Sequence, residues 1–458
     1  MPELIDRLGE IVGPAGLLRG AELAGRSAGY KRPLEELTAK ALVRPASTEE
    51  VARVLELCNE AGQSVVTQGG LTGLVDGNLS TAGDIILSLE RMRTIEEIDP
   101  ASATMTVQAG VTLQAVQEAA AEAGFLFPLD LGGRGSATIG GNIATNAGGN
   151  RVLRYGMARD MVLGLEVVQA DGVVLSSLGK IIKNNAGYDL KQMFIGSEGT
   201  LGVVTRIVLR LRPMPASQQT AYLAVGQFDD LPKLLDFCNR RSGGAVTAFE
   251  VMWRDFYELV TSAPGANPPL PLDYPFYILM EAMGGDPEAD QERFEMMLAA
   301  ALDDGLLLDA VIAKSQTETN AMWALRDDVE SLRTFGPTVG FDVGLPIALM
   351  PDYIDEVDKP ILARWPDRRR FVFGHLGDGN LHLTYSVGDA SAETRKLIDD
   401  AVYYPLASRG GSVSAEHGIG LSKRPYLEVS RSEAELALMR RIKAMMDPNG
   451  ILNPGKVI

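Results

Sequence analysis

The first half of the chain alternates short apolar runs with amphipathic segments of helical period. Helices are predicted at residues 47–62 and 113–122; the first opens with capping-box spacing from Ser47 to Glu50, and Gly62 can end it. Apolar, β-branched runs predict strands at residues 63–67, 85–89, 104–109, 162–169 and 203–211. We therefore expect a first domain that mixes sheets and helices.

A different pattern follows Pro213 and Pro215, which mark the clearest boundary because proline interrupts both strands and helices. A strand–helix–strand pattern then occurs twice, with strands predicted at residues 220–227, 246–253, 276–282 and 310–314 and helices at 231–241 and 287–302. This order is typical of a ferredoxin-like unit. Two more helices are predicted at residues 318–334 and 432–447.

Composition and charge exclude several classes of protein. The 458 residues suffice for two to four globular domains, and a net charge of −17 argues against nucleic acid as a partner. Cys58 and Cys238 lie far apart without metal or redox spacing, which favours two reduced structural thiols. The start of the chain is too acidic for a signal peptide, and no apolar run is long enough for a membrane span. We expect a cytoplasmic protein, with peripheral contact to the inner membrane left open.

All three histidines of the chain lie in two short glycine-rich segments near its end. Residues 377–380 (Gly-Asp-Gly-Asn) are a turn sequence between apolar runs that predict strands at 371–376 and 381–385. A four-residue loop would place His375 directly opposite His382, with their Cβ atoms about 4.5–5.5 Å apart. Both imidazoles would then be able to bind one ion.

The third histidine follows an acidic residue, in the sequence Glu416-His417. Two histidines and the Glu416 carboxylate would make a three-ligand site with open positions, the pattern of catalytic zinc or a related divalent metal such as manganese. His417 would remain as the titratable group that acts as general base. The alternative is that these histidines are structural side chains that happen to lie in glycine-rich loops.

Glycine-rich segments also occupy residues 68–73, 131–142 and 145–150. Glycine lets backbone N–H groups converge on phosphate oxygens, so together these loops favour a phosphate cradle, although each alone also fits an ordinary turn. None of them has the G-x-G-x-x-G pattern that opens a helix, with an acidic residue about 20 positions on, so a nicotinamide site of the Rossmann type is not supported.

Seven blocks in order resemble the FAD-dependent D-2-hydroxy-acid dehydrogenases, a family that includes D-lactate dehydrogenase, D-2-hydroxyglutarate dehydrogenase and the glycolate oxidase flavoprotein subunit. The blocks are residues 67–78, 128–149, 183–189 (KNNAGYD), 196–204 (GSEGTLGVV), 374–382, 414–418 and 447–456 (DPNGILNPGK). The resemblance implies an α+β protein with a two-subdomain FAD-binding domain of the vanillyl-alcohol-oxidase type. A ferredoxin-like substrate (cap) domain and a C-terminal helical segment that returns to the flavin would complete it. The expected bounds are 1–213 (core about 38–213), 214–410 and 411–458.

The resemblance also implies which residues bind FAD. They are Gly69, Gly70, Leu71, Thr72, Gly73, Pro128, Ser136, Thr138, Gly141, Asn142, Thr145, Gly148, Glu198, Gly199, Val204 and Asn453. Some relatives attach FAD covalently through a histidine of the FAD domain; this domain has none, so non-covalent FAD is expected.

The same resemblance implies metal ligation by His375, His382 and Glu416 and proton abstraction by His417. The C2 hydride of the substrate would pass to the flavin and leave a 2-oxo acid. Arg326 is similar to the arginine that binds the substrate carboxylate; the alternative is a solvated helix arginine near two aspartates. The electron acceptor is expected to be an electron-transfer flavoprotein, a quinone or a cytochrome rather than NAD, and a homodimer is left open.

Three substrate positions depart from the hydroxyglutarate-specific members of the family. Glu330, Gly340 and Thr384 stand where those members have Thr, Lys and Asn. Added negative charge and a missing lysine disfavour a second substrate carboxylate. With Gly340 and Phe341 as an apolar lining, we expect D-lactate or a longer apolar D-2-hydroxy monocarboxylate. The alternatives are D-2-hydroxyglutarate, a glycolate oxidase subunit and, more remotely, a metal-dependent hydrolase.

Overall fold

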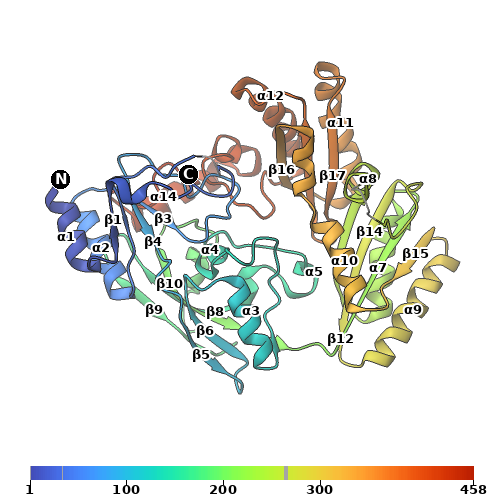
Figure 1. The fold of residues 1–458 in the computed structure, drawn as a ribbon, viewed down its shortest axis with the longest axis horizontal. Coiled ribbons are helices and arrows are strands. Elements are labelled where there is room, and N and C mark those ends of the chain that lie inside the picture. The colour runs from blue at the N-terminus through green and yellow to red at the C-terminus, as the bar shows by residue number, and fades with distance from the viewer. Residues whose placement is uncertain (1, 33–34, 263–266) are drawn as a thin grey trace. The chain divides into compact units, whose positions relative to one another are not determined.

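The computed structural model describes residues 2–32, 35–262 and 267–458 (Figure 1). The chain divides into two compact units, which are described separately. The first comprises Met1–Gly149, Gly156–Met214 and Glu416–Ile458, and the second comprises Asn150–Tyr155 and Pro215–Ala415. The main boundary lies between Met214 and Pro215, within the predicted proline step. The later boundary follows Ala415 rather than residue 410, because residues 411–415 pair with the second unit.

The first unit contains two main sheets. One is four-stranded in the order β1-β2-β4-β3, and its strands β2, β4 and β3 run parallel. The other is five-stranded and antiparallel in the order β5-β6-β10-β8-β9. The strands are β1 (Leu17–Leu18), β2 (Ala41–Val43), β3 (Val65–Gln68), β4 (Ile85–Ser88), β5 (Ile95–Asp99), β6 (Thr104–Gln108), β8 (Val162–Val168), β9 (Val174–Ser177) and β10 (Val203–Arg210). A short pair joins β7 (Phe125–Leu126) to β11 (Arg212–Pro213).

The α-helices of the first unit include those predicted at residues 47–62, 113–122 and 432–447. They are α1 (Pro2–Val12), α2 (Thr48–Glu60), α3 (Leu113–Glu122), α4 (Ile139–Ala144), α6 (Lys191–Phe194), α13 (Leu427–Ser430) and α14 (Glu433–Met446). Ser47 caps α2 by accepting the N–H of Glu50, but the Glu50 carboxylate accepts from Ala46 rather than from Ser47. Only half of the predicted capping box forms. None of the helices in the described ranges is long and apolar enough to cross a membrane.

After α14 the chain returns to the parallel sheet. The N–H of Val65 donates to the carbonyl of Ile451, and the N–H of Asn453 donates to the carbonyl of Val65. The Asn453 side chain accepts from the N–H of Thr67 at 2.9 Å. The last residues of the chain are therefore fixed beside β3, the strand that enters the first glycine-rich loop.

The second unit is built on one antiparallel sheet in the order β15-β12-β14-β13-β17-β18-β16. Its strands are β12 (Ser217–Val225), β13 (Val246–Trp253), β14 (Phe276–Gly284), β15 (Asp309–Ile312), β16 (Thr338–Gly344), β17 (Arg369–His375) and β18 (Asn380–Ser386). Helices α7 (Asp230–Ser242) and α9 (Pro287–Asp303) pack together against this sheet (Figure 1). The first four strands have the ferredoxin-like order predicted from the sequence, and the remaining three extend that sheet beyond β13.

The helix predicted at residues 318–334 is wrong as one continuous element. Helix α10 (Gln316–Asp327) ends at Asp328, which leaves the helical region, and a 3-10 helix, η3 (Glu330–Phe335), follows. The Asp328 carboxylate accepts the N–H of Ser331 at 3.2 Å and so begins the new turn. Apolar periodicity alone does not reveal this break, because both segments keep an apolar face. The other helices are α5 (Val152–Tyr155), α8 (Arg254–Thr261), α11 (Met350–Arg364) and α12 (Ala392–Tyr403).

A cluster of aromatic side chains fixes the strand that leads to the predicted metal site. Phe371 and Phe373 of β17 are buried with Phe256 and Tyr257 of α8 and with Tyr277 of β14. The rings of Phe256 and Phe373 stack at 4.2 Å between centroids. Pairs of this kind add stability beyond their buried area, so the end of β17 is held rigidly where His375 emerges.

Candidate metal and cofactor sites

The hairpin β17–β18 brings His375 and His382 together, but not in the predicted register. The residue opposite His382 is Phe373, not His375. Residues 376–378 form a 3-10 turn and Gly379 follows at φ 80°, so the loop begins and ends one residue earlier than expected. Because Phe373 and His375 are two residues apart on one strand, both face the same side as His382. The two imidazoles are diagonal neighbours whose ring centroids lie 5.3 Å apart.

Glu416 is the residue that directly follows Ala415, the last residue of the second unit. The N–H of Ala415 donates to the carboxylate of Asp342 at 3.1 Å, and Asp342 lies opposite His382 in the β16–β18 ladder. Chain continuity therefore holds Glu416 beside the histidines. One ligand atom from each of His375, His382 and Glu416 lies within 4.8 Å of the others. Two imidazoles and one carboxylate form a donor set that suits zinc or manganese.

A residue that the sequence analysis missed, Glu250, orients the first histidine. Glu250 lies opposite His375 in the β13–β17 ladder, and its Oε1 is 2.7 Å from His375 Nδ1. This contact leaves Nε2 of His375 to face a metal, the arrangement in which a carboxylate behind a histidine fixes its tautomer and raises its basicity. An isolated glutamate in the apolar strand VTAFEVMW is the signal that could have found it.

Arg326 completes a buried charged network around Glu250. Its Nη2 and Nε donate to Glu250 Oε2 at 2.8 and 3.0 Å, and its guanidinium lies 5.0 Å from the centre of the Phe373 ring. Burial would raise the pKa of Glu250, but His375 and Arg326 together hold that pKa below its ordinary value. Arg326 is 4% exposed, which rules out a solvated helix arginine. Its contact with a substrate carboxylate remains a prediction.

The predicted substrate positions occupy both faces of β16. Gly340 is exposed and lies opposite Thr384, and a Cβ added there would meet only Thr384 Oγ1, at 3.7 Å. Phe341 points to the other face, where it is buried edge-on against Tyr403 at 5.4 Å. Its assignment to the substrate lining is therefore wrong, because neighbouring strand residues face opposite sides. Glu330 is exposed, and its carboxylate lies 3.1 Å from Arg333.

The glycine-rich loops of the first unit pack directly on one another. A Cβ on Gly70 would lie 1.9 Å from the carbonyl oxygen of Ser136, and one on Gly69 would lie 2.5 Å from Thr138 Oγ1. Nearby, Thr67 Oγ1 and Asn142 Oδ1 are buried without a hydrogen-bond partner. A narrow backbone cradle with an unpaired hydroxyl beside it fits a diphosphate group, whose oxygens would accept from backbone N–H groups and from Thr67 Oγ1.

Glu198 and Asn453, both predicted to contact FAD, bind the chain itself in this structure. The Glu198 carboxylate accepts the N–H groups of Ile419 and Gly420 at 2.7 and 2.8 Å. The Asn453 amide donates to the Glu198 carbonyl at 2.6 Å. Val204 is buried within β10 opposite Val167. Glu198 and Asn453 thus bind backbone of the first unit, Val204 lies within a sheet, and the direct contact of all three with FAD stays a prediction.

Comparison with protein families identifies both units. Residues 39–177 match the FAD binding domain, and residues 214–457 match the C-terminal domain of FAD linked oxidases. D-2-hydroxyglutarate dehydrogenase of Bos taurus mitochondria is 41% identical over 92% of this chain and 77% of its own length. The chain belongs to the FAD-dependent D-2-hydroxy-acid dehydrogenases.

Other members of this family carry different names. A putative mitochondrial D-lactate dehydrogenase of Schizosaccharomyces pombe is 35% identical over 91% of this chain and 81% of its own. D-2-hydroxyglutarate dehydrogenase of Xanthomonas citri is 39% identical over 91% of this chain and 89% of its own length. The eukaryotic relatives are named mitochondrial, which contradicts the cytoplasmic location expected from the sequence; that expectation is wrong and is withdrawn.

Solved structures confirm the predicted fold class. p-Cresol methylhydroxylase superimposes with a TM-score of 0.78 at 17% identity and covers 99% of this chain and 96% of its own. Alkyldihydroxyacetonephosphate synthase also superimposes with a TM-score of 0.78, at 16% identity. The match covers 100% of this chain and 86% of that chain. At these identities the similarity shows the FAD-binding fold of the vanillyl-alcohol-oxidase type and nothing of the substrate.

Proposed function

We propose that this dehydrogenase oxidises a D-2-hydroxy monocarboxylate to its 2-oxo acid with the help of a divalent cation. FAD-linked oxidation of D-2-hydroxy acids follows from its family. The cation is supported by one observation above all: His375, His382 and Glu416 converge, and Glu250 orients the first of them from behind. A structural histidine pair needs neither a third ligand nor a buried carboxylate of this kind.

The residues of the chain would divide the work as follows. The glycine-rich cradle of the first unit would hold FAD, which supplies the acceptor for the C2 hydride when bound. His375, His382 and Glu416 would hold the cation, whose Lewis acidity would lower the pKa of the 2-hydroxyl. His417, half-buried and next to Glu416 in the chain, would take the hydroxyl proton. Arg326 would bind the C1 carboxylate, with its orientation fixed by Glu250.

A monocarboxylate substrate is supported by the surface around Gly340. The exposed glycine opposite Thr384 offers no cation for a second substrate carboxylate. D-2-hydroxyglutarate is the second candidate, because several relatives at about 40% identity carry that name. The acceptor of the electrons is proposed to be an electron-transfer flavoprotein, a quinone or a cytochrome.

Anaerobic stopped-flow spectroscopy of the flavin tests this function. The purified holoenzyme would be mixed with D-lactate, L-lactate, D-2-hydroxyglutarate and longer D-2-hydroxy acids, with and without a chelator. We expect bleaching by D-monocarboxylates, loss of bleaching after chelation, and recovery on adding zinc or manganese. Bleaching that survives complete metal removal would refute the metal, and faster bleaching by D-2-hydroxyglutarate would refute the substrate preference.

A further inference from the structure

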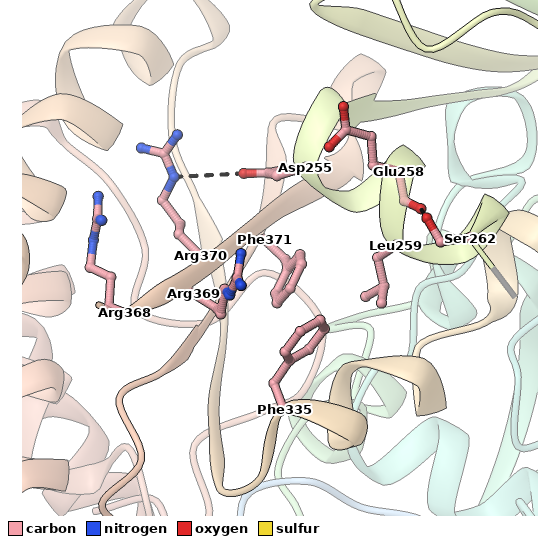
Figure 2. A pocket seen from close by; sticks show the side chains of 9 residues that line it. All are labelled: Asp255, Glu258, Leu259, Ser262, Phe335, Arg368, Arg369, Arg370 and Phe371. Carbon is pink, nitrogen blue, oxygen red and sulfur yellow. Dashed lines mark hydrogen bonds and ion pairs between the residues drawn. The ribbon is translucent and has the colours of Figure 1, made fainter. Parts of the chain in front are cut away.

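The second unit contains a cavity of about 440 Å³ that the proposed reaction does not use (Figure 2). It lies between α8 and the beginning of β17, and its lining includes Asp255, Glu258, Leu259, Phe335, Arg369 and Phe371. Strand β17 begins at this cavity with Arg369 and ends six residues later at His375. At about 3.3 Å per residue, the cavity is about 20 Å along the strand from the metal ligands.

One wall of the cavity is cationic, and its middle arginine has no acidic partner. Arg368 binds Asp358 through two nitrogens, and Arg370 lies 3.4 Å from the same carboxylate. Arg369 has no carboxylate within ion-pair distance in the described part of the chain; its guanidinium lies 5.5 Å from the centre of the Phe335 ring. In a chain with a net charge of −17, a guanidinium left unpaired at a cavity indicates a binding site for a carboxylate.

The opposite wall, formed by α8, is acidic. Asp255 Oδ1 accepts the N–H groups of Phe256 at 2.8 Å and Val372 at 3.4 Å, and Oδ2 forms a long ion pair with Arg370 Nε at 3.8 Å. Burial raises the pKa of Asp255 to about 6 although Arg370 and the two N–H groups lower it. Glu258, one turn further along α8, is half-exposed and binds Arg254. This wall would accept an ammonium group.

Between the two charged walls lies an apolar surface. Figure 2 shows Phe335, Phe371 and Leu259 grouped below Asp255 and Glu258, with Arg369 beside Phe371. The rings of Phe335 and Phe371 are 5.2 Å apart, and Phe335 is 38% exposed. An exposed phenylalanine beside a buried one leaves aromatic surface for a ligand to cover.

We propose that this cavity binds a zwitterionic α-amino acid with a large apolar side chain. Its carboxylate would pair with Arg369, its ammonium group would face Asp255 and Glu258, and its side chain would lie on Phe335 and Leu259. A dicarboxylate would place one negative charge beside the carboxylates of Asp255 and Glu258, and a simple monoanion would have no group to face them. Only a zwitterion complements both walls, so the site differs in its chemistry from the hydroxy-acid site.

Isothermal titration of the FAD-loaded enzyme with L-phenylalanine tests the proposal. Each control ligand lacks one feature: 3-phenylpropanoate has no ammonium group, phenethylamine has no carboxylate, and glycine has no apolar body. We expect L-phenylalanine to bind at least about tenfold more tightly than each of them. Equal binding of 3-phenylpropanoate would overturn the proposal, as would the absence of L-phenylalanine binding.

Single substitutions test whether L-phenylalanine binds in this cavity. Arg369→Gln and Phe335→Ala should each weaken L-phenylalanine binding about tenfold or more, because both side chains are exposed and replaceable without a buried cavity. Arg364→Gln, at the end of α11 and outside the cavity, is the matched control and should bind like the parent. His375→Ala should also retain binding. Loss of binding in His375→Ala with retention in Arg369→Gln would assign the ligand to the catalytic site and refute the cavity.

Discussion

The substitution Glu250→Gln separates a positioning role from a merely structural one. The carboxylate is 1% exposed and has two partners, His375 Nδ1 at 2.7 Å and the Arg326 guanidinium at 2.8 Å. Glutamine preserves the shape but removes the charge, which leaves Arg326 buried without a counter-ion. Breaking a buried ion pair costs about 3–5 kcal/mol. Because glutamine keeps part of the hydrogen bonding, we expect the free energy of unfolding to fall by about 3 kcal/mol.

Two measurements follow from this change. A loss of about 3 kcal/mol in a unit of this size should lower Tm by about 6–12 °C, as seen by calorimetry of the metal-free protein. Because a neutral glutamine no longer fixes and polarises His375, zinc affinity should fall about 10–100-fold in competition with a chromophoric chelator. Zinc affinity is the decisive measurement, because the loss of any buried ion pair would lower Tm.

Glu281→Gln is the matched control. Glu281 is also fully buried in the same sheet and pairs with Arg151 at 3.0 Å, but it does not touch a histidine. It should lower Tm to a similar extent and leave zinc affinity unchanged. The reasoning fails if Glu250→Gln keeps the parent's zinc affinity, or if both variants lose metal equally.

Three further predictions concern the cradle, the substrate and pH. Gly70→Ala should abolish FAD retention, because its Cβ would lie 1.9 Å from the Ser136 carbonyl, whereas Gly132→Ala, with open space around it, should keep the flavin absorbance. Gly340→Lys should raise kcat/KM for D-2-hydroxyglutarate relative to D-lactate, since it adds a cation where there is room. Burial raises the pKa of Asp255 to about 6, so the folded state of the parent loses stability as the pH rises from the unfolded value of about 4 to about 6, and the loss is constant above that pH. Asp255→Asn should therefore gain thermal stability relative to the parent between about pH 4 and about pH 6, measured by calorimetry, and a difference that does not change over this range would contradict the assignment.

Elements with strong local signals could be predicted from the sequence. The helix at 113–122 and the strand at 246–253 occur with the predicted bounds, and the ferredoxin-like order follows from the alternation of patterns. Strand β5 was missed because its sequence, Ile-Glu-Glu-Ile-Asp, has three acidic residues and none that is buried, at the edge of a sheet. Edge strands carry weak apolar alternation, so periodicity does not detect them.

The candidate site was also predicted from the sequence only in part. The scarcity of histidine and the turn at residues 377–380 were enough to bring His375, His382 and Glu416 together in the prediction. The register within the hairpin was not, because the 3-10 turn depends on the backbone of Gly379 and on Asp378 accepting the N–H of Asn380. The role of Glu250 was not predicted: the isolated glutamate in an apolar strand marks the position, but its partner lies 125 residues along the chain.

Both sides of the histidine hairpin are held by buried acids from the flanking strands. Glu250 on β13 fixes His375, and Asp342 on β16 lies opposite His382 while accepting the N–H of Ala415, the residue before Glu416. Each acid interrupts an otherwise apolar strand, a position where an ionised group is costly without a partner. A lone buried acid in a strand that flanks a histidine hairpin therefore indicates a supported ligand set. This rule could have located both supports from the topology before any contact was known.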